Sequence, residues 1–446
     1  MITTPLTGIQ RPMADIRPFL GIRYDTHRFG RDISALLAPP YDVLDASDKE
    51  ALLAAGMENI VAVDLPHVPP KQAGPEEVYA DAAARLEAWR EDGVVVSERA
   101  PALYRYHQTF QHDGRQITRR MLIARLRLEP FGTGRVFPHE QTFPGAKADR
   151  LKLMQATRCN LSAVFGLYSD ADGVVSHLLT GFPGPADATG MLDGVLNEIW
   201  VVSNTGLQAQ VTAAMADKNF YIADGHHRYE TALTYRDELA DELGSLPDEH
   251  PANYLMVVLC AMEDPGLLIL PTHRVVATPG GFDAAAFAEQ IAERFETLLV
   301  TDPPQAAPFA ASLSKYGRAA IGLYDGSTAK YCVLKPRGDD VLESLAPDKP
   351  AAWRRLDVAA LHRYLITEVL SPHHLGGADP KIRYLKDAAG AVDLAASEQH
   401  AVAFLLQPID LADLRAVCEA GEVMPQKSTF FAPKLATGLV INPLED

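Results

Sequence analysis

The 446-residue sequence is poor in cysteine, with only four such residues. They are widely spaced, and no Cys-x-x-Cys pair occurs. We therefore interpret them as reduced structural thiols of a cytoplasmic protein, not as a disulfide framework. The four are Cys159, Cys260, Cys332 and Cys418.

Long apolar segments are also missing. The longest apolar run covers residues 255–262, which is far too short to span a bilayer. The N-terminal sequence MITTPLTGIQRP has no basic start followed by an apolar block, so no signal peptide is indicated. We expect a cytoplasmic protein with no membrane partner.

Runs of lysine or arginine are absent, and acidic residues outnumber basic ones by 58 to 41. The net charge of −17 disfavours broad nucleic-acid binding, which depends on releasing counterions from phosphates. A local basic pocket for a phosphorylated small molecule remains compatible with this balance. The sequence is compatible with a homodimer as well as with a monomer.

The length and the hydrophobic content of 47% predict two or three soluble domains with a large core. Strand and helix patterns alternate in a mixed α/β (α+β) order. The PGG run within residues 278–282 suggests a boundary. We expect a catalytic domain over 14–278 and a smaller α/β domain over 279–446, whose loops contribute to the site.

Several local patterns give sharper expectations. Residues 59–65 (NIVAVDL) resemble a strand, and residues 75–92 resemble a helix with proline at its start and acids in its first turn. Asp113-Gly114 between two strand-like runs predicts a hairpin. Residues 359–370 predict a long amphipathic helix.

The most informative segment is FYIADGHHRYETAL, residues 220–233. Its apolar start predicts a buried strand, Asp224 and Gly225 break it, and a helical pattern begins at Tyr229. In a strand–turn–helix the N–H groups of residues 225–228 form an anion site, to which His226, His227 and Arg228 add donors. Asp224 is a candidate to hold a divalent cation or to orient a histidine. Alternatively, Asp224 caps the helix and Gly225 only eases the turn.

A second polar group lies in VFPHEQTFPGAKADR, residues 136–150. His139, Glu140 and Thr142 stand together there, and a carboxylate beside a histidine is a candidate general base. Asp42 and Asp149 are rival acids. The alternative is a surface loop leading into a capped helix.

Two later segments carry further candidates. His273 and Arg274 follow a strand-like run, either in a pocket or on an exposed rim. The loop MPQKSTFFAPK places Lys427, Ser428 and Thr429 together, but it lacks the glycine-rich lead of a Walker loop. It also fits a polar turn beside two packed phenylalanines.

Three further segments are IRPFLGIRY, APPYDV and HHLG. Together with the segments above, they resemble a widespread prokaryotic family, the domain of unknown function called ten-fifteen. The resemblance covers almost the whole chain. The signature turn is similar to that of the ParB/sulfiredoxin-like superfamily. His226 stands where sulfiredoxins carry cysteine, so redox repair is not implied. Asp-Gly-His-His-Arg resembles the free L-serine kinases instead. The implied fold is a ParB/sulfiredoxin-like core with large insertions.

The resemblance implies a kinase that transfers a phosphoryl group from ATP, ADP or pyrophosphate to free L-serine or a similar small hydroxy compound. Glu140 would accept the hydroxyl proton, and His226, His227 and Arg228 would stabilise the transferring phosphate. Mg²⁺ would bridge the donor phosphates near Asp224. Arg274 and Lys427 would neutralise further substrate charge. The alternative is a ParB-like nucleotide-binding regulatory protein without metabolic kinase activity.

Overall fold

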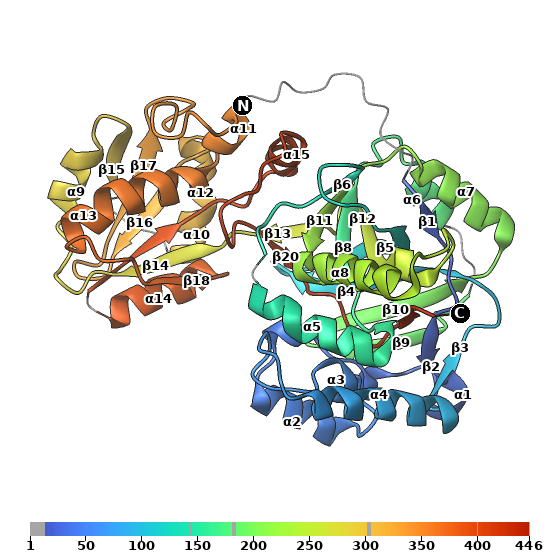
Figure 1. Cartoon of the computed structure of the whole chain (residues 1–446). Helices are drawn as coiled ribbons and strands as arrows, with labels where there is room; N and C mark the ends of the chain where they lie inside the picture. Colours follow the sequence, from blue (N-terminus) through green and yellow to red (C-terminus); the bar gives the residue numbers. More distant parts are fainter. Residues whose placement is uncertain (1–13, 143, 181–183, 301–304, 399, 446) are drawn as a thin grey trace. The chain divides into compact units, whose positions relative to one another are not determined.

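The computed structural model describes residues 14–142, 144–180, 184–300, 305–398 and 400–445, and it has the predicted mixed α/β architecture (Figure 1). The chain divides into two compact units. The first comprises the chain up to Pro138, Thr142–Leu267 and the chain from Pro433 onward. The second comprises His139–Gln141 and Leu268–Ala432.

This division differs from one linear boundary near residue 278. Strand β14 (His273–Ala277) pairs with β18 (Ile382–Leu385) and β19 (Ala401–Leu405), so it belongs to the sheet of the second unit. The chain then returns, because β21 (Asn442–Pro443) pairs with β7 (Cys159–Asn160) in the first unit. Sequence spacing alone gives no signal for such a return.

The first unit is built on one mixed sheet. Two pairs within it, β11 with β6 and β12 with β8, are parallel, and its other pairs are antiparallel. β1 (Ile16–Arg17) also pairs with β5 but stands outside the linear strand order of the sheet. The strand order is β6 (Val136–Phe137), β11 (Phe220–Asp224), β8 (Val164–Tyr168), β12 (Tyr254–Ala261), β5 (Arg115–Arg127), β4 (Leu103–His112), β10 (Val195–Val202) and β9 (Ala188–Leu192).

Helices α5 (Pro144–Thr157) and α8 (His226–Leu243) pack on this sheet (Figure 1). Met154 of α5 and Tyr229 of α8 are buried in one apolar cluster with strand residues. Burying this apolar surface fixes both helices on the sheet. The unit also contains the α-helices and strands α1 (Thr26–Phe29), α2 (Ala46–Ala55), α3 (Val61–Asp64), α4 (Glu76–Glu91), α6 (Val174–Leu179), α7 (Thr205–Met215), β2 (Ile22–Tyr24) and β3 (Val95–Ser97).

The local predictions for this unit have mixed outcomes. The hairpin at Asp113-Gly114 is confirmed, since both residues have the positive φ of a type I′ turn, 49° and 71°. The helix over 75–92 is confirmed as α4. The strand over 59–65 is wrong, because α3 occupies that segment. The side chain of Asn59 accepts from the N–H of Val61 and donates to Leu37, so it starts a helical turn.

The second unit has an antiparallel sheet of its own in the order β15 (Phe295–Val300), β17 (Lys330–Pro336), β16 (Ile321–Asp325), β19, β14 and β18. β13 (Leu268–Leu270) and β20 (Phe430–Ala432) form a separate pair. The predicted helix over 359–370 is present, but residues Leu361–Leu370 adopt a π-helix. The α-helices of this unit are α9 (Ala284–Ile291), α10 (Ala306–Ser312), α11 (Ala351–Arg354), α12 (Asp357–Ala360), α13 (Ser371–His374), α14 (Ala388–Ser397) and α15 (Leu411–Glu419).

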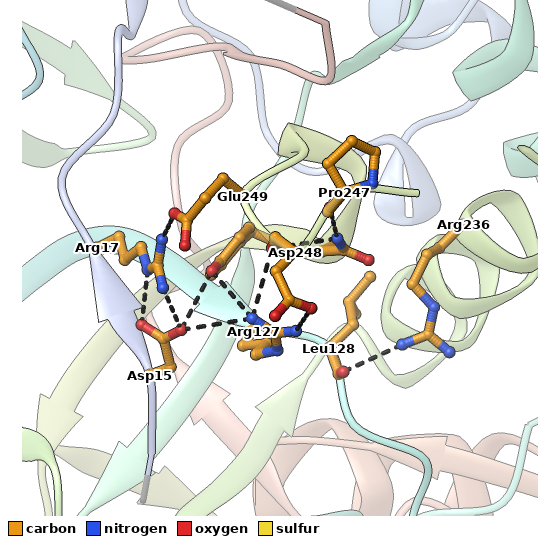
Figure 2. A network of polar contacts seen from close by, with 10 residues as sticks. Asp15, Arg17, Arg127, Leu128, Arg236, Pro247, Asp248 and Glu249 are labelled. Carbon is orange, nitrogen blue, oxygen red and sulfur yellow. Dashed lines mark hydrogen bonds and ion pairs between the residues drawn. The ribbon is translucent and has the colours of Figure 1, made fainter. Parts of the chain in front are cut away.

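A polar network fastens the edge strand β1 to its neighbours (Figure 2). The carboxylate of Asp15 accepts from Nε of Arg17 at 2.8 Å and from the hydroxyl of Tyr254 at 3.1 Å. Arg127 of β5 pairs with Asp15 at 3.8 Å and with Asp248 at 3.2 Å. In the part of the chain that the structure describes, no helix is both long and apolar enough to cross a membrane.

Gly21, in the IRPFLGIRY segment, stands against the buried Tyr104. A Cβ at this position would lie 2.1 Å from the Tyr104 hydroxyl oxygen and 2.7 Å from Cγ1 of Val440. We predict that Gly21→Ala lowers the free energy of unfolding by about 1–3 kcal/mol, the cost of overpacking a core. Urea unfolding measures it, with Gly338→Ala as control, because that glycine has open space around it. Equal stability of the two variants would contradict this account.

Candidate anion-binding and catalytic site

The signature segment forms the predicted strand, turn and helix. β11 ends at Asp224, Gly225 has the left-handed φ of 93°, and α8 begins at His226, three residues before the predicted start. The pairing of β11 with β8 shifts register between Ile222 and Asp224. Such irregularities re-aim a side chain at the end of a strand.

The Asp224 carboxylate lies between two cations. One oxygen accepts from the Lys434 ammonium, and the other accepts from Nη2 of Arg228 at 2.7 Å. Burial alone would raise the pKa of Asp224, but the charges of Lys434 and Arg228 lower it well below its usual range. Asp224 is therefore an anion at neutral pH, and it holds both cations in place.

Arg228 is folded back beneath the turn. It is 7% exposed, and Nη1 donates to the Ala163 carbonyl while Nη2 donates to Asp224. A Cβ at position 225 would lie 2.9–3.0 Å from the guanidinium, so glycine is needed both for its φ and for this approach. His226 is buried, and His227 is half-buried beside it.

Sequence reasoning missed Lys434, which the structure brings to the signature turn. Its carbonyl accepts from Nε2 of Gln108 at 2.9 Å, and the carbonyl of Pro433 accepts from the buried Arg119 at 2.6 Å. These contacts fix the segment that carries the lysine. Its only sequence signal is its place at the end of MPQKSTFFAPK, 210 residues after Asp224.

Thr142 is the other predicted site residue of the first unit. Its hydroxyl donates to Oε2 of Glu230, in the first turns of α8, at 2.6 Å. Lys147 of α5 pairs with the same carboxylate. Thr142 therefore lies beside the helix that starts at the signature turn.

Asp149, one of the two rival acids, is buried and forms polar contacts inside the first unit. It is 1% exposed, accepts from the Tyr79 hydroxyl at 2.8 Å and pairs with Arg150 at 2.7 Å. Arg150 also donates to the carbonyl of the buried Asp64. A cavity of about 30 Å³, large enough to hold a water molecule, lies beside Arg150 and Arg228. The other rival, Asp42, pairs with Lys71 at 3.7 Å.

The second unit gathers predicted residues from two distant segments. Nε2 of His139 lies 2.8 Å from the Thr429 hydroxyl, and Oε1 of Glu140 accepts from the N–H of Lys427 at 3.4 Å. Lys427 has a positive φ of 56°, an uncommon conformation that is often found at functional sites. Ser428 is buried, and its hydroxyl donates to Pro425 within the loop.

Arg274 anchors this loop from the inside. It is fully buried, and Nη2 donates to the carbonyls of Gln426 and Lys427 at 3.2 and 3.0 Å. Its Nε lies 3.2 Å from Nε2 of His362, on the π-helix. Of the two interpretations, an exposed rim does not apply, because the guanidinium lies inside the unit and holds the backbone that carries Lys427.

A protein-held Mg²⁺ does not fit Asp224 as the structure has it. Both carboxylate oxygens accept from cations, and a divalent ion would be repelled by Lys434 and Arg228. Among the residues that the structure describes, no group of three histidine, cysteine, aspartate or glutamate side chains is placed to bind a metal.

The chain is thus a mixed α/β protein whose first unit carries a basic strand–turn–helix motif. The family model described as "Protein of unknown function (DUF1015)" matches residues 16–359, so the chain belongs to this family. No curated protein matches the chain in a sequence search.

Solved structures show only a distant likeness. A free serine kinase in complex with AMP has a TM-score of 0.32 at 14% identity, covering 68% of this chain and 89% of its own. A conserved hypothetical protein from Pyrococcus furiosus scores 0.31 at 14% identity, covering 68% and 92%. SbnI with a C-terminal truncation, from Staphylococcus aureus, scores 0.32 at 14% identity, covering 70% and 84%. At this level of likeness, their activities do not transfer to this chain.

The surroundings of Arg274 give the second unit a pH-dependent stability. Burial, together with the nearby charge of Arg274, lowers the pKa of His273 and of His362 from 6.5 to about 4. As the pH drops from 6.5 to 4, these histidines therefore bind protons in the unfolded chain but not in the folded one. The free energy of unfolding falls over this range. Burial raises the pKa of Asp357 from 3.8 to about 6, which opposes this trend. Two histidines outweigh one carboxyl group.

We predict that His362→Gln reduces this acid-induced loss of stability by about 2–3 kcal/mol, because one of the two histidines no longer titrates. The glutamine oxygen can still accept from Arg274. Urea unfolding across this pH range measures the effect, and the exposed His373→Gln is the control. If the free energy of unfolding of His362→Gln changed with pH in the same way as that of the wild type, His362 would not contribute to the acid-induced loss of stability.

Proposed function

We propose that the protein is a small-molecule kinase, which transfers a phosphoryl group from a nucleotide or pyrophosphate to free L-serine or a similar hydroxy compound. The observation that carries this proposal is the Asp224 carboxylate held between Lys434 and Arg228 at the start of α8. One negative and two positive charges leave a positive excess at the end of the helix where the backbone dipole also favours anions.

In this proposal the donor phosphates bind at the turn of residues 225–228. The backbone N–H groups, His226, His227 and Lys434 offer the donors, while the buried Arg228 supplies charge from beneath. Phosphoryl transfer depends mainly on positioning and on stabilising charge, which such a set of residues supplies. Mg²⁺ enters only as the counter-ion that the donor brings with it.

Glu140 is the proposed general base. Its half-buried carboxylate has the Lys427 N–H as a partner, and His139 and Thr429 bond to each other beside it. Lys427, Ser428 and Thr429 are proposed to bind the acceptor, with Arg274 holding their loop.

Phosphorus NMR tests the reaction class directly. The purified protein is incubated with Mg²⁺ and ATP, ADP or pyrophosphate in turn, with and without a panel of hydroxy amino acids. A new phosphomonoester that requires both donor and acceptor supports the kinase. Slow hydrolysis of the nucleotide without acceptor phosphorylation would favour the alternative, a ParB-like nucleotide-binding regulator.

We predict that Lys434→Gln weakens donor binding by about 1.5–3 kcal/mol, since a charge-assisted contact to phosphate is lost. Isothermal titration calorimetry with ADP and pyrophosphate measures the change. Lys218→Gln is the matched control, because Lys218 also pairs with an aspartate, Asp170, in the same unit. Equal donor affinity for Lys434→Gln and the control would refute the role of Lys434.

We predict that Glu140→Gln retains donor affinity but lowers turnover by about 10²–10⁴-fold, the usual contribution of a general base. The amide oxygen can still accept from Lys427, so the loop stays in place. Asp42→Asn is the comparison, because Asp42 is the remaining rival acid. Near-normal turnover in Glu140→Gln with a loss in Asp42→Asn would move the base to Asp42.

A further inference from the structure

A large cavity of the first unit lies away from the signature turn. It measures about 1000 Å³, which is at the upper end of the range for small-molecule sites. The IRPFLGIRY segment forms one wall with Pro18, Phe19, Leu20 and Ile22. The proposed kinase chemistry does not use this segment.

Apolar side chains and prolines form part of the walls of the cavity. Leu20 and Val96 line it and are 44% and 42% exposed, among the most exposed large apolar side chains of the described chain. Pro101 and Pro443 also line it, and proline fixes its own backbone φ. The apolar body of a ligand would cover Leu20 and Val96 and remove their apolar surface from water.

The charges on the lining favour an anion. Three lining residues are arginines, Arg90, Arg125 and Arg158, and two are acids, Glu87 and Glu445. The lining thus carries a net charge of +1 in a chain whose net charge is −17. Guanidinium groups bind carboxylate and phosphate with paired, directional hydrogen bonds.

Arg125 is the best-fixed of the three arginines. Its Nε donates to Oδ1 of the buried Asn442 at 2.6 Å, and its Nη2 donates to the carbonyl of Pro443 at 2.8 Å. The guanidinium carbon lies 5.5 Å from the ring centre of Phe19, which also lines the cavity. The side chain is therefore already ordered, so a ligand would lose little further entropy in binding it.

Arg90 and Arg158 have acidic partners at the edges of the cavity. Arg90 pairs with Glu87 at 3.4 Å, and Arg158 pairs with Glu445 at 2.6 Å. All four side chains are between 37% and 61% exposed, so these pairs are weak and can exchange partners. An incoming anion can recruit either arginine.

Helix α5 separates this cavity from the proposed phosphate site. Lys147, near the start of α5, pairs with Glu230 beside the signature turn, whereas Arg158 directly follows the last residue of α5. Eleven residues of helix correspond to about 16 Å. The lining includes none of the residues assigned to the kinase site.

We propose that this cavity is a second binding site, which takes a small organic anion with an apolar body. Arg125 binds the carboxylate or phosphate headgroup, and Leu20 and Val96 cover the apolar part. This proposal does not depend on the kinase reaction.

Calorimetry with the full-length protein tests the site through four probes: naphthylacetate, naphthyl phosphate, the uncharged naphthylacetamide, and acetate. We expect saturable binding of the two naphthyl anions, and at least about tenfold weaker binding of the amide and of acetate. The stronger of the two anions identifies the headgroup. Equal binding of anion and amide, or no saturable binding of either naphthyl anion, would overturn the proposal.

Variants locate the bound probe. Arg125→Gln should weaken naphthyl-anion binding about tenfold or more, whereas Arg127→Gln, on the same strand but outside the lining, should not. Ala84→Glu places a negative charge in the cavity from the exposed side of α4, and it decides the matter if Arg125→Gln does not fold. Its control is Ala88→Glu, one turn further along α4 and outside the lining. Equal affinities in Ala84→Glu and Ala88→Glu would refute this location.

Discussion

The arrangement of the signature turn in the first unit depends on the Asp224 carboxylate, which pairs with two cations. Asp224 ends a buried strand and holds Arg228 on one oxygen and Lys434 on the other. A partly buried acid at this place would be costly without partners, and two cations so close together would repel each other without the acid. Removing Asp224 would leave two neighbouring cations without a counter-charge, so the carboxylate is what holds Arg228 and Lys434 together. Lys434 lies in the terminal segment that passes β4 and β5, so its pairing with Asp224 also fixes the path of this segment.

That constraint also accounts for the glycine of the signature. The Arg228 guanidinium reaches Asp224 by lying against position 225, where a Cβ would come within 3.0 Å of it. A left-handed φ at the same residue lets α8 begin directly after the turn. Strand, turn and helix therefore place the start of α8 beside a group with excess positive charge. This combination of backbone and side-chain charge is the basis of the proposed phosphate site.

In the second unit, a buried arginine organises a loop instead of meeting solvent. Arg274 holds the carbonyls of Gln426 and Lys427, and its Nε contacts His362 on the π-helix. The loop in turn presents the Lys427 N–H to Glu140 and the Thr429 hydroxyl to His139. Irregular helices of this kind are frequent at functional sites. The proposed acceptor-binding residues are thus ordered by interactions that lie below the surface.

The sequence by itself determined the mixed α/β class, the hairpin at Asp113-Gly114, helix α4 and the strand–turn–helix of the signature, because apolar periodicity and turn residues act locally. It indicated His139 and Glu140 in one segment and Lys427 to Thr429 in another, but not that these residues meet. It misassigned residues 59–65, where the side chain of Asn59 outweighs the strand-like pattern. Only the tertiary structure brought Lys434 to Asp224, buried Arg274 and Asp149, and returned the terminal segment to the first unit. These outcomes depend on burial and on polar contacts between residues up to 326 positions apart, and no local pattern encodes such contacts.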